Sequence, residues 1–384
     1  MIVKNGKIVL EDKVIEQGWI KIEDSKIVQI EAGTTDLPGL DVEGKWILPG
    51  FIDCHVHGGY GVDFEFGDAK RFEHFSKNIV QEGVTTYVQA SVTNSTANNL
   101  KYLTEFQNFM QQKDSQVGKC LGAHFEGPFI SPDKKGAHEL SLLQKPTIAE
   151  LQKLMEVNPQ LVKIITYAPE LQNGEFTESL LANQILPSAG HSNILFKDFE
   201  MHHKQGIKHL THLYNGMSGI SQRDPGLAAA GLYYDDVLCE LITDGIHVDV
   251  ETIKLTYKIK GYQGICIITD AVNAKGLPDG NYKLGNLNVT KTGIKVFLSD
   301  SGTLAGAGAT YDHNVRVMLK TISNLKMNEL IYMTSINIAK QLGIFEQTGS
   351  ITVGKKADLV ILDKNFEVVK TFVDGDIKFE REKK

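Results

Sequence analysis

Eight short apolar runs recur along the middle of the chain, and most are followed by a segment with helical periodicity. This alternation implies an α/β protein with a parallel sheet, and eight such units over roughly 250 residues match a (β/α)₈ barrel of the TIM type. A doubly wound open sheet is the alternative, but no Gly-rich dinucleotide turn follows the first run. The runs are WILPGFIDCHVH, GVTTYVQAS, KCLGAHFEG, VKIITYAPE, ILPSAGHS, IKHLTHLYN, VLCELITDGIH and GICIITDA. The helix-like segments include RFEHFSKNIVQEG, TANNLKYLTEFQNFMQQ, TIAELQKLMEVN and DVETIKLTYKIKG.

The two ends of the chain follow a different pattern, in which short strands alternate with tight turns. The N-terminal part contains MIVKNGKIVL and GWIKIEDSKIVQIEAG, and the C-terminal part contains SITVGKKADLVILD and NFEVVKTFVDGDIKF. We expect residues 1–48 and 349–384 to combine into one small β-sandwich domain and residues 49–348 to form the barrel. The final EREKK is expected to be a solvated tail.

Composition excludes some classes of function. With 42% apolar and 23% charged residues, the 384-residue chain has the composition of a soluble globular protein. Its net charge of −7 argues against a nucleic-acid surface but leaves room for a local basic pocket that binds an anion. No apolar run approaches the roughly 20 residues of a membrane span, and the N-terminus resembles a strand and turn rather than a leader. We therefore expect a cytoplasmic protein with no nucleic-acid or membrane partner.

The cysteines predict no disulfide framework. None forms a C-x-x-C pair, and each lies inside an apolar run, so we expect buried, reduced thiols. Cys54 precedes His55, and neighbours on a regular strand point to opposite faces. Cys54 is therefore not expected to share a site with His55. The cysteines are Cys54, Cys120, Cys239 and Cys266.

Polar side chains gather at the carboxyl ends of the apolar runs, where a barrel places its active site. They are His55, His57, Glu126, His191, His212, His247 and Asp270. One histidine at the end of a strand is more often a hydrogen-bonded core residue than a ligand. Imidazoles and carboxylates that converge on one barrel mouth nevertheless predict a metal site, in which a carboxylate can bridge two ions. We expect cations, and no basic side chain, to keep Glu126 ionised.

Six other histidines are not expected to be metal ligands. His209 is three residues before His212, so strand alternation places it on the opposite face, toward the helices. His124 shares a face with Glu126 one layer deeper, and either orients a ligand or belongs to the core. Four others fall in helix-like segments and are expected at the surface: His74, His202, His203 and His313.

Short motifs over almost the whole chain resemble the amidohydrolase superfamily of metal hydrolases and, within it, the N-acetylglucosamine-6-phosphate deacetylase family. The HVH pair and the GKKADL ending are shared across the superfamily, whereas HFEGPF together with GAH, AGHS and THLYNGM is specific to these deacetylases. The motifs are PGFIDCHVHG (49–58), HFEGPFI (124–130), GAH (136–138), AGHS (189–192), THLYNGM (211–217), DGIH (244–247), TDA (269–271), LAG (304–306) and GKKADL (354–359).

The resemblance implies a divalent metal, Zn, Fe, Mn or Co, at one or two ions per subunit. Three residues match the ligands of the ion that all members use: Glu126, His191 and His212. Two match the ligands of a second ion that some members lack: His55 and His57. Asp270 matches the catalytic acid/base. It would take the proton of the attacking water and return it to the leaving amine.

The resemblance also implies a 2-acetamido sugar 6-phosphate as substrate. Taken alone, Arg223 would be a surface arginine, but its position after THLYNGM matches a phosphate ligand that reaches a neighbouring subunit, which implies a homodimer. The LAGAGAT stretch (304–310) lacks the ending of a P-loop, and we expect it to line the acetyl pocket or cover the barrel mouth. The residues that match substrate contacts are Ala137, His138, Asn215, Gly216, Arg223, His247 and Leu304.

Two other functions remain open. One is a cyclic amidase of the dihydroorotase or hydantoinase type, many of which bridge their metals with a carboxylated lysine at a strand end. Glu126 takes the bridging position here, and the fourth run ends in Ala-Pro-Glu, which disfavours that class. The other is an inactive sugar-phosphate-binding homologue, which the presence of every ligand and of the acid/base disfavours.

Overall fold

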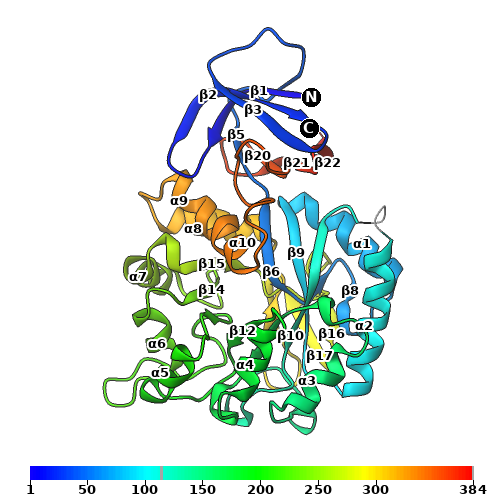
Figure 1. The fold of residues 1–384 in the computed structure, drawn as a ribbon, viewed down its shortest axis with the longest axis vertical. Helices are drawn as coiled ribbons and strands as arrows, with labels where there is room; N and C mark the ends of the chain where they lie inside the picture. Colours follow the sequence, from blue (N-terminus) through cyan, green and yellow to red (C-terminus); the bar gives the residue numbers. More distant parts are fainter. Residues whose placement is uncertain (113–115, 383–384) are drawn as a thin grey trace.

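The fold is built around a parallel sheet of eight strands (Figure 1), in a computed structural model that describes residues 1–112 and 116–382. The strands are β6 (Phe51–Val56), β9 (Val84–Ser91), β10 (Lys119–Glu126), β11 (Val162–Tyr167), β12 (Leu186–Ala189), β13 (His209–Leu210), β14 (Leu238–Ile242) and β15 (Ile265–Ile268). They neighbour one another in chain order, and each of the eight predicted runs contributes one strand. A bridge between Val56 and Ala271 joins the two outer strands. The sheet is therefore a nearly closed barrel, which confirms the predicted fold class.

Helices cover the outside of the barrel (Figure 1). They are α1 (Ala69–Ile79), α2 (Thr96–Gln111), α3 (Ile148–Met155), α4 (Glu175–Ala182), α5 (Phe196–Lys204), α6 (Leu227–Tyr233), α7 (Val250–Lys260), α8 (Tyr311–Thr321), α9 (Met327–Ile331) and α10 (Asn337–Gln341). The four predicted helical segments contain α2, α3, α7 and all but the first two residues of α1. The side chains of Asp68, Ser95 and Thr147 accept hydrogen bonds from the first turns of α1, α2 and α3, which explains where these helices begin.

The inner face of the barrel changes register along β6. Pairing with β9 is irregular between Asp53 and Val56. Cys54 Sγ lies 3.6 Å from one carboxylate oxygen of Glu240, and His55 Nδ1 lies 2.8 Å from the other. The two neighbours thus reach the same carboxylate. The expectation that Cys54 and His55 point apart is wrong, because the irregularity breaks strand alternation.

A four-stranded antiparallel sheet, which the sequence analysis missed, is inserted between β15 and α8. Its strands are β16 (Gly280–Leu284), β17 (Leu287–Thr292), β18 (Lys295–Leu298) and β19 (Leu304–Ala307). The backbone N–H of Ala307 donates to the carbonyl of Asp270 at 2.8 Å. This bond ties the insertion to the carboxyl end of β15, at the mouth of the barrel. A further two-stranded sheet, β7 (Gly58–Gly59) and β8 (Val62–Asp63), follows β6.

The two chain ends form a separate sheet domain, which confirms that they combine (Figure 1). Its strands are β1 (Ile2–Val9), β2 (Val14–Glu23), β3 (Lys26–Ala32), β4 (Leu40–Asp41), β5 (Trp46–Pro49), β20 (Leu359–Leu362), β21 (Val368–Val373) and β22 (Asp376–Glu380). All of them are hydrogen-bonded into one sheet with its own apolar core, which includes Val3, Ile20 and Leu359. We propose the limits 1–48 and 349–384 for this domain. The last two residues of the predicted tail, 383–384, lie outside the described part of the chain.

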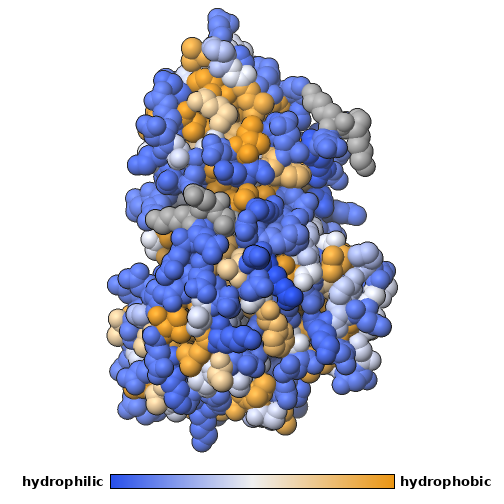
Figure 2. Space-filling view, turned by 90° about the vertical axis from the view of Figure 1, so that its right-hand side faces the viewer, coloured by the Kyte–Doolittle hydropathy of each residue, from blue (hydrophilic) through white to orange (hydrophobic). Residues whose placement is uncertain are grey.

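The surface and the cysteines fit the composition. The face shown in Figure 2 is mostly hydrophilic, with apolar side chains gathered on the small sheet domain. Within residues 1–112 and 116–382, no helix has the length and apolar character needed to cross a membrane. The four cysteines are buried and unpaired, as expected.

Candidate functional site

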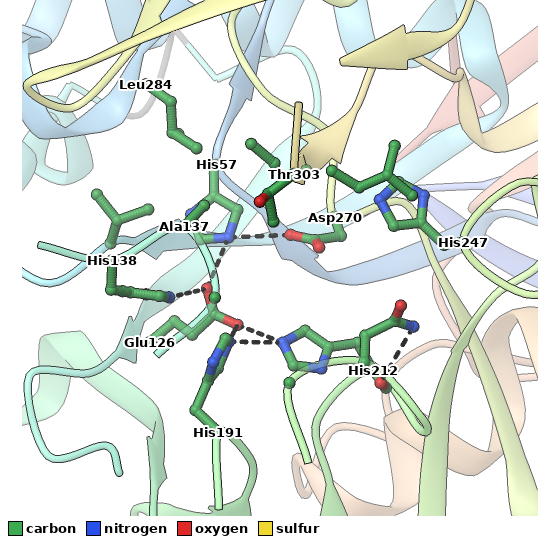
Figure 3. Close-up of a pocket in the computed structure, with 17 residues that line it drawn as sticks. His57, Glu126, Ala137, His138, His191, His212, His247, Asp270, Leu284 and Thr303 are labelled. Carbon is green, nitrogen blue, oxygen red and sulfur yellow. Dashed lines mark hydrogen bonds and ion pairs between the residues drawn. The ribbon is translucent and has the colours of Figure 1, made fainter. Parts of the chain in front are cut away.

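One cavity of about 230 Å³ opens at the carboxyl ends of the barrel strands, and most of the predicted site residues line it (Figure 3). Two predicted residues do not. His55 is fully buried behind the wall, and Arg223 is exposed on the loop before α6. The predicted residues that line the cavity are His57, Glu126, Ala137, His138, His191, His212, Asn215, Gly216, His247, Asp270 and Leu304.

Glu126, the last residue of β10, stands at the centre of the site. Its Oε1 lies 2.7 Å from His212 Nε2 and 3.2 Å from His191 Nε2, and its Oε2 lies 3.2 Å from His57 Nε2. Burial raises the pKa of this carboxyl, but the neighbouring His55 and His191 outweigh burial and hold the pKa well below its usual range. Glu126 is therefore an ionised carboxylate that faces two groups of imidazoles.

His191 and His212 form the first imidazole pair. Their Nε2 atoms are 3.0 Å apart, close to the separation of about 3.4 Å expected for two nitrogens bound to one tetrahedral ion. His191 Nδ1–H donates to the carbonyl of Lys134 at 2.7 Å, which leaves Nε2 as the atom aimed at Glu126. Both histidines have positive φ, 46° and 30°, a backbone conformation that non-glycine residues rarely adopt outside constrained sites.

His55 and His57 form the second pair, at and after the end of β6, with Nε2 atoms 3.1 Å apart. Asp270 Oδ1 lies 3.1 Å from His57 Nε2 and 3.5 Å from His55 Nε2. Burial lowers the pKa of His57, but its hydrogen bonds with Asp270 and Glu126 raise the pKa to about 9. Because both Nε2 atoms face the carboxylates, this pair and Asp270 form a second group of ligand-type atoms beside Glu126.

Asp270 follows β15 and has a φ of 51°. Its backbone N–H donates to the carbonyl of His55 at 2.9 Å, so the backbone of two strands fixes its position. Burial raises the pKa of the Asp270 carboxyl, but the charges of His55 and His57 lower this pKa by more than burial raises it. The pKa of Asp270 is therefore below its ordinary value. Asp270 is thus an ionised base that is 8% exposed at the cavity wall.

Two cavity histidines have tautomers set by hydrogen bonds. The backbone N–H of Thr93 donates to His138 Nδ1 at 3.1 Å, so the ring proton lies on Nε2, which faces the cavity 3.4 Å from Glu126 Oε2. Burial lowers the pKa of His138 to about 4, which keeps the ring neutral. His247 Nδ1 donates to Asp244 at 2.7 Å, which leaves its Nε2 for a ligand.

Gly216 must be glycine at its position. It has a φ of 55°, and a Cβ added there would lie 2.7 Å from His191 Nδ1. Any side chain would displace the His191 ring. Asn215 is held by its own backbone N–H, which donates to the carbonyl of His212 at 2.9 Å. The turn after β13 therefore brings the chain close to the first imidazole pair.

Comparison with known proteins identifies the family. Residues 46–378 match the model of the amidohydrolase family. The chain belongs to the amidohydrolase family. It is also 35% identical to the N-acetylglucosamine-6-phosphate deacetylase of Bacillus subtilis, over 99% of this chain and 97% of that protein. This likeness places the chain within the N-acetylglucosamine-6-phosphate deacetylase group of the family, as the motifs predicted.

Solved structures agree with this membership. The N-acetylglucosamine-6-phosphate deacetylase of Thermotoga maritima is 34% identical, with a TM-score of 0.90 over 99% of this chain and all of that one. A mutant of the Mycobacterium smegmatis enzyme in complex with N-acetyl-D-glucosamine-6-phosphate is 25% identical, with a TM-score of 0.92 over 98% and 99% of the two chains. The likeness therefore covers both the barrel and the small sheet domain.

The side chains of this amidohydrolase fit a divalent metal. Two groups of buried ligand-type atoms share Glu126: one with His191 and His212, the other with His55, His57 and Asp270. Imidazole nitrogens and carboxylate oxygens suit Zn, Fe, Mn and Co alike. These two groups are the candidate metal centre.

Several contributors to this amidohydrolase site were not predicted. Leu284 and Thr303 come from the inserted sheet and line the cavity, and Asp244 and Thr93 set the tautomers described above. Glu240, in the middle of the buried strand β14, contacts His55 from behind. A lone charged residue inside the run VLCELI was the signal for it, because buried carboxylates need partners.

Three other histidines, for which the sequence carried expectations, lie inside the protein. His209 does not lie on the outer face of the sheet: its Nε2 lies 2.9 Å from Glu240 inside the barrel, and its Nδ1 contacts Gln341 at the end of α10. His202 is not a surface residue: it is buried, with Gln172 Nε2 3.3 Å from its ring. His124 is also buried and contacts the carbonyl of Cys54 and the hydroxyl of Thr166, so it packs behind His55 as a core residue.

Proposed function

We propose that this amidohydrolase removes the acetyl group of N-acetyl-D-glucosamine 6-phosphate and releases D-glucosamine 6-phosphate and acetate. The observation that carries the proposal is the position of Glu126 between two imidazole pairs, with Asp270 3.1 Å from His57 at the wall of one cavity. The 35% identity to a deacetylase over nearly the whole chain supports the substrate class.

In this proposal, Glu126, His191 and His212 would hold one divalent ion, and His55 and His57 would hold a second beside the shared Glu126. When bound, such an ion acts as a Lewis acid that makes both the amide carbonyl and water more reactive. The protein itself fixes the orientation of the side chains that would bind the ion. The His191 ring is fixed by the carbonyl of Lys134 and faces Gly216, and His55 is fixed by Glu240.

Proton transfer belongs to Asp270 in this proposal. Its ionised carboxylate takes the proton of the attacking water, and the resulting carboxylic acid returns it to the nitrogen of the leaving amine, so one group serves both steps. His138 presents a neutral Nε2–H to the cavity, where it can donate to the oxygen of the tetrahedral intermediate. Ala137, Asn215, Gly216, His247 and Leu304 would shape the sugar pocket.

The phosphate needs a cation that the cavity lacks. Among the residues that the structure describes, no lysine or arginine lines the cavity wall. Arg223 is exposed on a loop 6 residues after Met217 of the THLYNGM motif, so a second subunit can supply it. We propose a homodimer in which Arg223 binds the phosphate across the interface, in the bidentate way that suits guanidinium.

Replacing Arg223 by alanine is expected to raise KM for the phosphorylated sugar by about 10- to 100-fold, because charge-assisted hydrogen bonds contribute about 1.5–3 kcal/mol. The value of kcat should change little, since Arg223 lies far from the reacting amide in this arrangement. Steady-state kinetics of acetate release measures both constants. Lys197→Ala, which removes a cation outside the cavity wall, is the matched control, and an unchanged KM in Arg223→Ala would contradict the phosphate role.

The first experiment is a comparison of acetate release from N-acetylglucosamine 6-phosphate and from the unphosphorylated sugar, before and after chelation. Activity that is confined to the phosphorylated sugar and lost on chelation is the expected result. The galactosamine epimer is included, because the geometry of the cavity does not choose between epimers. If the metal-bound protein releases no acetate from any of these sugars, the proposal is contradicted and a cyclic amidase is favoured. Bound sugar phosphate without acetate release would favour an inactive binding protein. We also propose a cytoplasmic location.

A further inference from the structure

Glu240 is a buried carboxylate that does not line the cavity. It lies in the middle of β14 and has no exposed surface. Burying a carboxylate without partners would cost several kcal/mol of folding free energy. The contacts of Glu240 therefore indicate its role. Its two oxygens face different groups, one toward the candidate metal centre and the other toward the opposite end of the barrel.

The oxygen Oε2 accepts from one residue of each histidine pair, from a ring in one case and from the backbone in the other. It accepts a hydrogen bond from His55 Nδ1 at 2.8 Å and another from the backbone N–H of His212 at 3.1 Å. His55 therefore carries its proton on Nδ1, and its Nε2 points toward His57, Glu126 and Asp270. A carboxylate behind an imidazole that faces a metal fixes the tautomer and the orientation of the ring.

The other oxygen, Oε1, faces a separate cation. His209 Nε2 lies 2.9 Å from Oε1, and His209 Nδ1 lies 2.5 Å from Gln341 Oε1. The amide of Gln341 is oriented by its Nε2–H, which donates to the carbonyl of Lys208 at 2.8 Å. Both ring nitrogens of His209 thus face acceptors, so both carry protons. His209 therefore supplies a positive charge beside Glu240 on the side away from His55.

We propose that Glu240 is the positioning residue for the second metal ion: it accepts from His55 Nδ1–H and so directs His55 Nε2 into the group formed with His57 and Asp270. The inference rests on the two-ion form of the proposed function. Glu240 touches no substrate and acts through His55. His209 compensates its charge from the far side of the barrel, which makes a carboxylate at this depth possible.

The test is a metal titration that needs no substrate. Metal-free wild type and Glu240→Gln are titrated with Zn²⁺ against a chromophoric chelator, and bound zinc is counted per chain. Glutamine can keep two of the contacts, because its carbonyl can accept from His55 and from the backbone N–H of His212. Its amino group can donate to His209 Nε2 only when that ring has lost the Nε2 proton. The variant therefore removes the charge of residue 240, and His209 becomes neutral with it, while the hydrogen bond to His55 is kept. Asp358→Asn is the control, because Asp358 is a buried carboxylate bonded to Thr348 and Lys119 near the small domain.

We expect two zinc ions in wild type and in the control. In Glu240→Gln, the first ion should bind as in wild type, and the affinity for the second should fall by about 10- to 100-fold. One ion in wild type, an unchanged second affinity in Glu240→Gln, or an equal loss at both ions would overturn the inference. A purely structural role would lower the Tm of the metal-free variant without separating the two affinities.

A second variant keeps the inference testable if the first variant does not fold. If Glu240→Gln does not fold, Glu240→Asp replaces it, because a shorter carboxylate keeps the charge but cannot reach His55 and His209 together, and the same selective loss is expected. The titration is also independent of catalysis. Two ions with a Glu240-dependent second affinity but no acetate release would contradict the proposed function alone. Acetate release by wild type that holds one ion would contradict this inference alone.

Discussion

Asp270→Asn is expected to keep its metal and lose nearly all turnover. The amide has almost the shape of the carboxylate, so the backbone bonds of residue 270 to His55 and Ala307 should persist. It cannot take the proton of the attacking water, however, and general acid–base catalysis is worth about 10²- to 10⁴-fold in rate. We expect kcat for acetate release to fall by that factor, with KM changed much less. Kinetics at saturating substrate and a metal count on the same sample check both parts.

The control for this variant is Asp358→Asn, an equivalent change in a buried carboxylate remote from the cavity, which should behave as wild type. Two results would contradict the assignment, and they differ in meaning. An active Asp270→Asn enzyme would place the acid/base elsewhere. A variant that has lost metal would make Asp270 a ligand, a role that its distance of 3.1 Å from His57 Nε2 also allows.

The barrel could be predicted from the sequence because strands buried on both faces are apolar along their whole length. Each of the eight runs contains a barrel strand for that reason. The inserted sheet β16–β19 is different, because it is partly exposed and its strands are short. Its alternation of polar and apolar residues, NYKLGNLNVTKTGIKVFL, with Gly-containing turns, was nevertheless a usable strand signal.

Most residues of the candidate site could be predicted to meet in one cavity because a barrel gathers its strand ends at one mouth. The predictions for His209 and Cys54 were wrong because they assumed regular alternation of side chains where the strand has ended or its pairing is irregular. β13 consists of His209 and Leu210 only, and His212 has a φ of 30°, so alternation from His212 back to His209 does not hold. Cys54 and His55 are separated by an irregular pairing in β6. Neither departure leaves a mark in local composition.

Glutamine at position 126 is expected to empty the metal centre. Glu126 is the only carboxylate shared by the two groups of ligand-type atoms within residues 1–112 and 116–382, and a neutral amide is a weak ligand for Zn, Fe, Mn or Co. We expect less than one ion per chain and a fall in kcat of at least about 10³-fold, since metal activation is worth several kcal/mol. Added metal should raise the Tm of the metal-free wild type but not that of the variant, because only a bound ligand stabilises the folded state.

The matched control is Glu65→Gln, because Glu65 is an equally buried glutamate in the opposite electrostatic environment. Burial raises its pKa to about 8, so it keeps its proton at pH 7, whereas imidazoles hold the pKa of Glu126 well below its usual range. Removing the charge should therefore matter at position 126 and not at 65. If Glu126→Gln retained two ions, or if both variants lost metal equally, the ionised carboxylate between the imidazole pairs would not be what binds the metal.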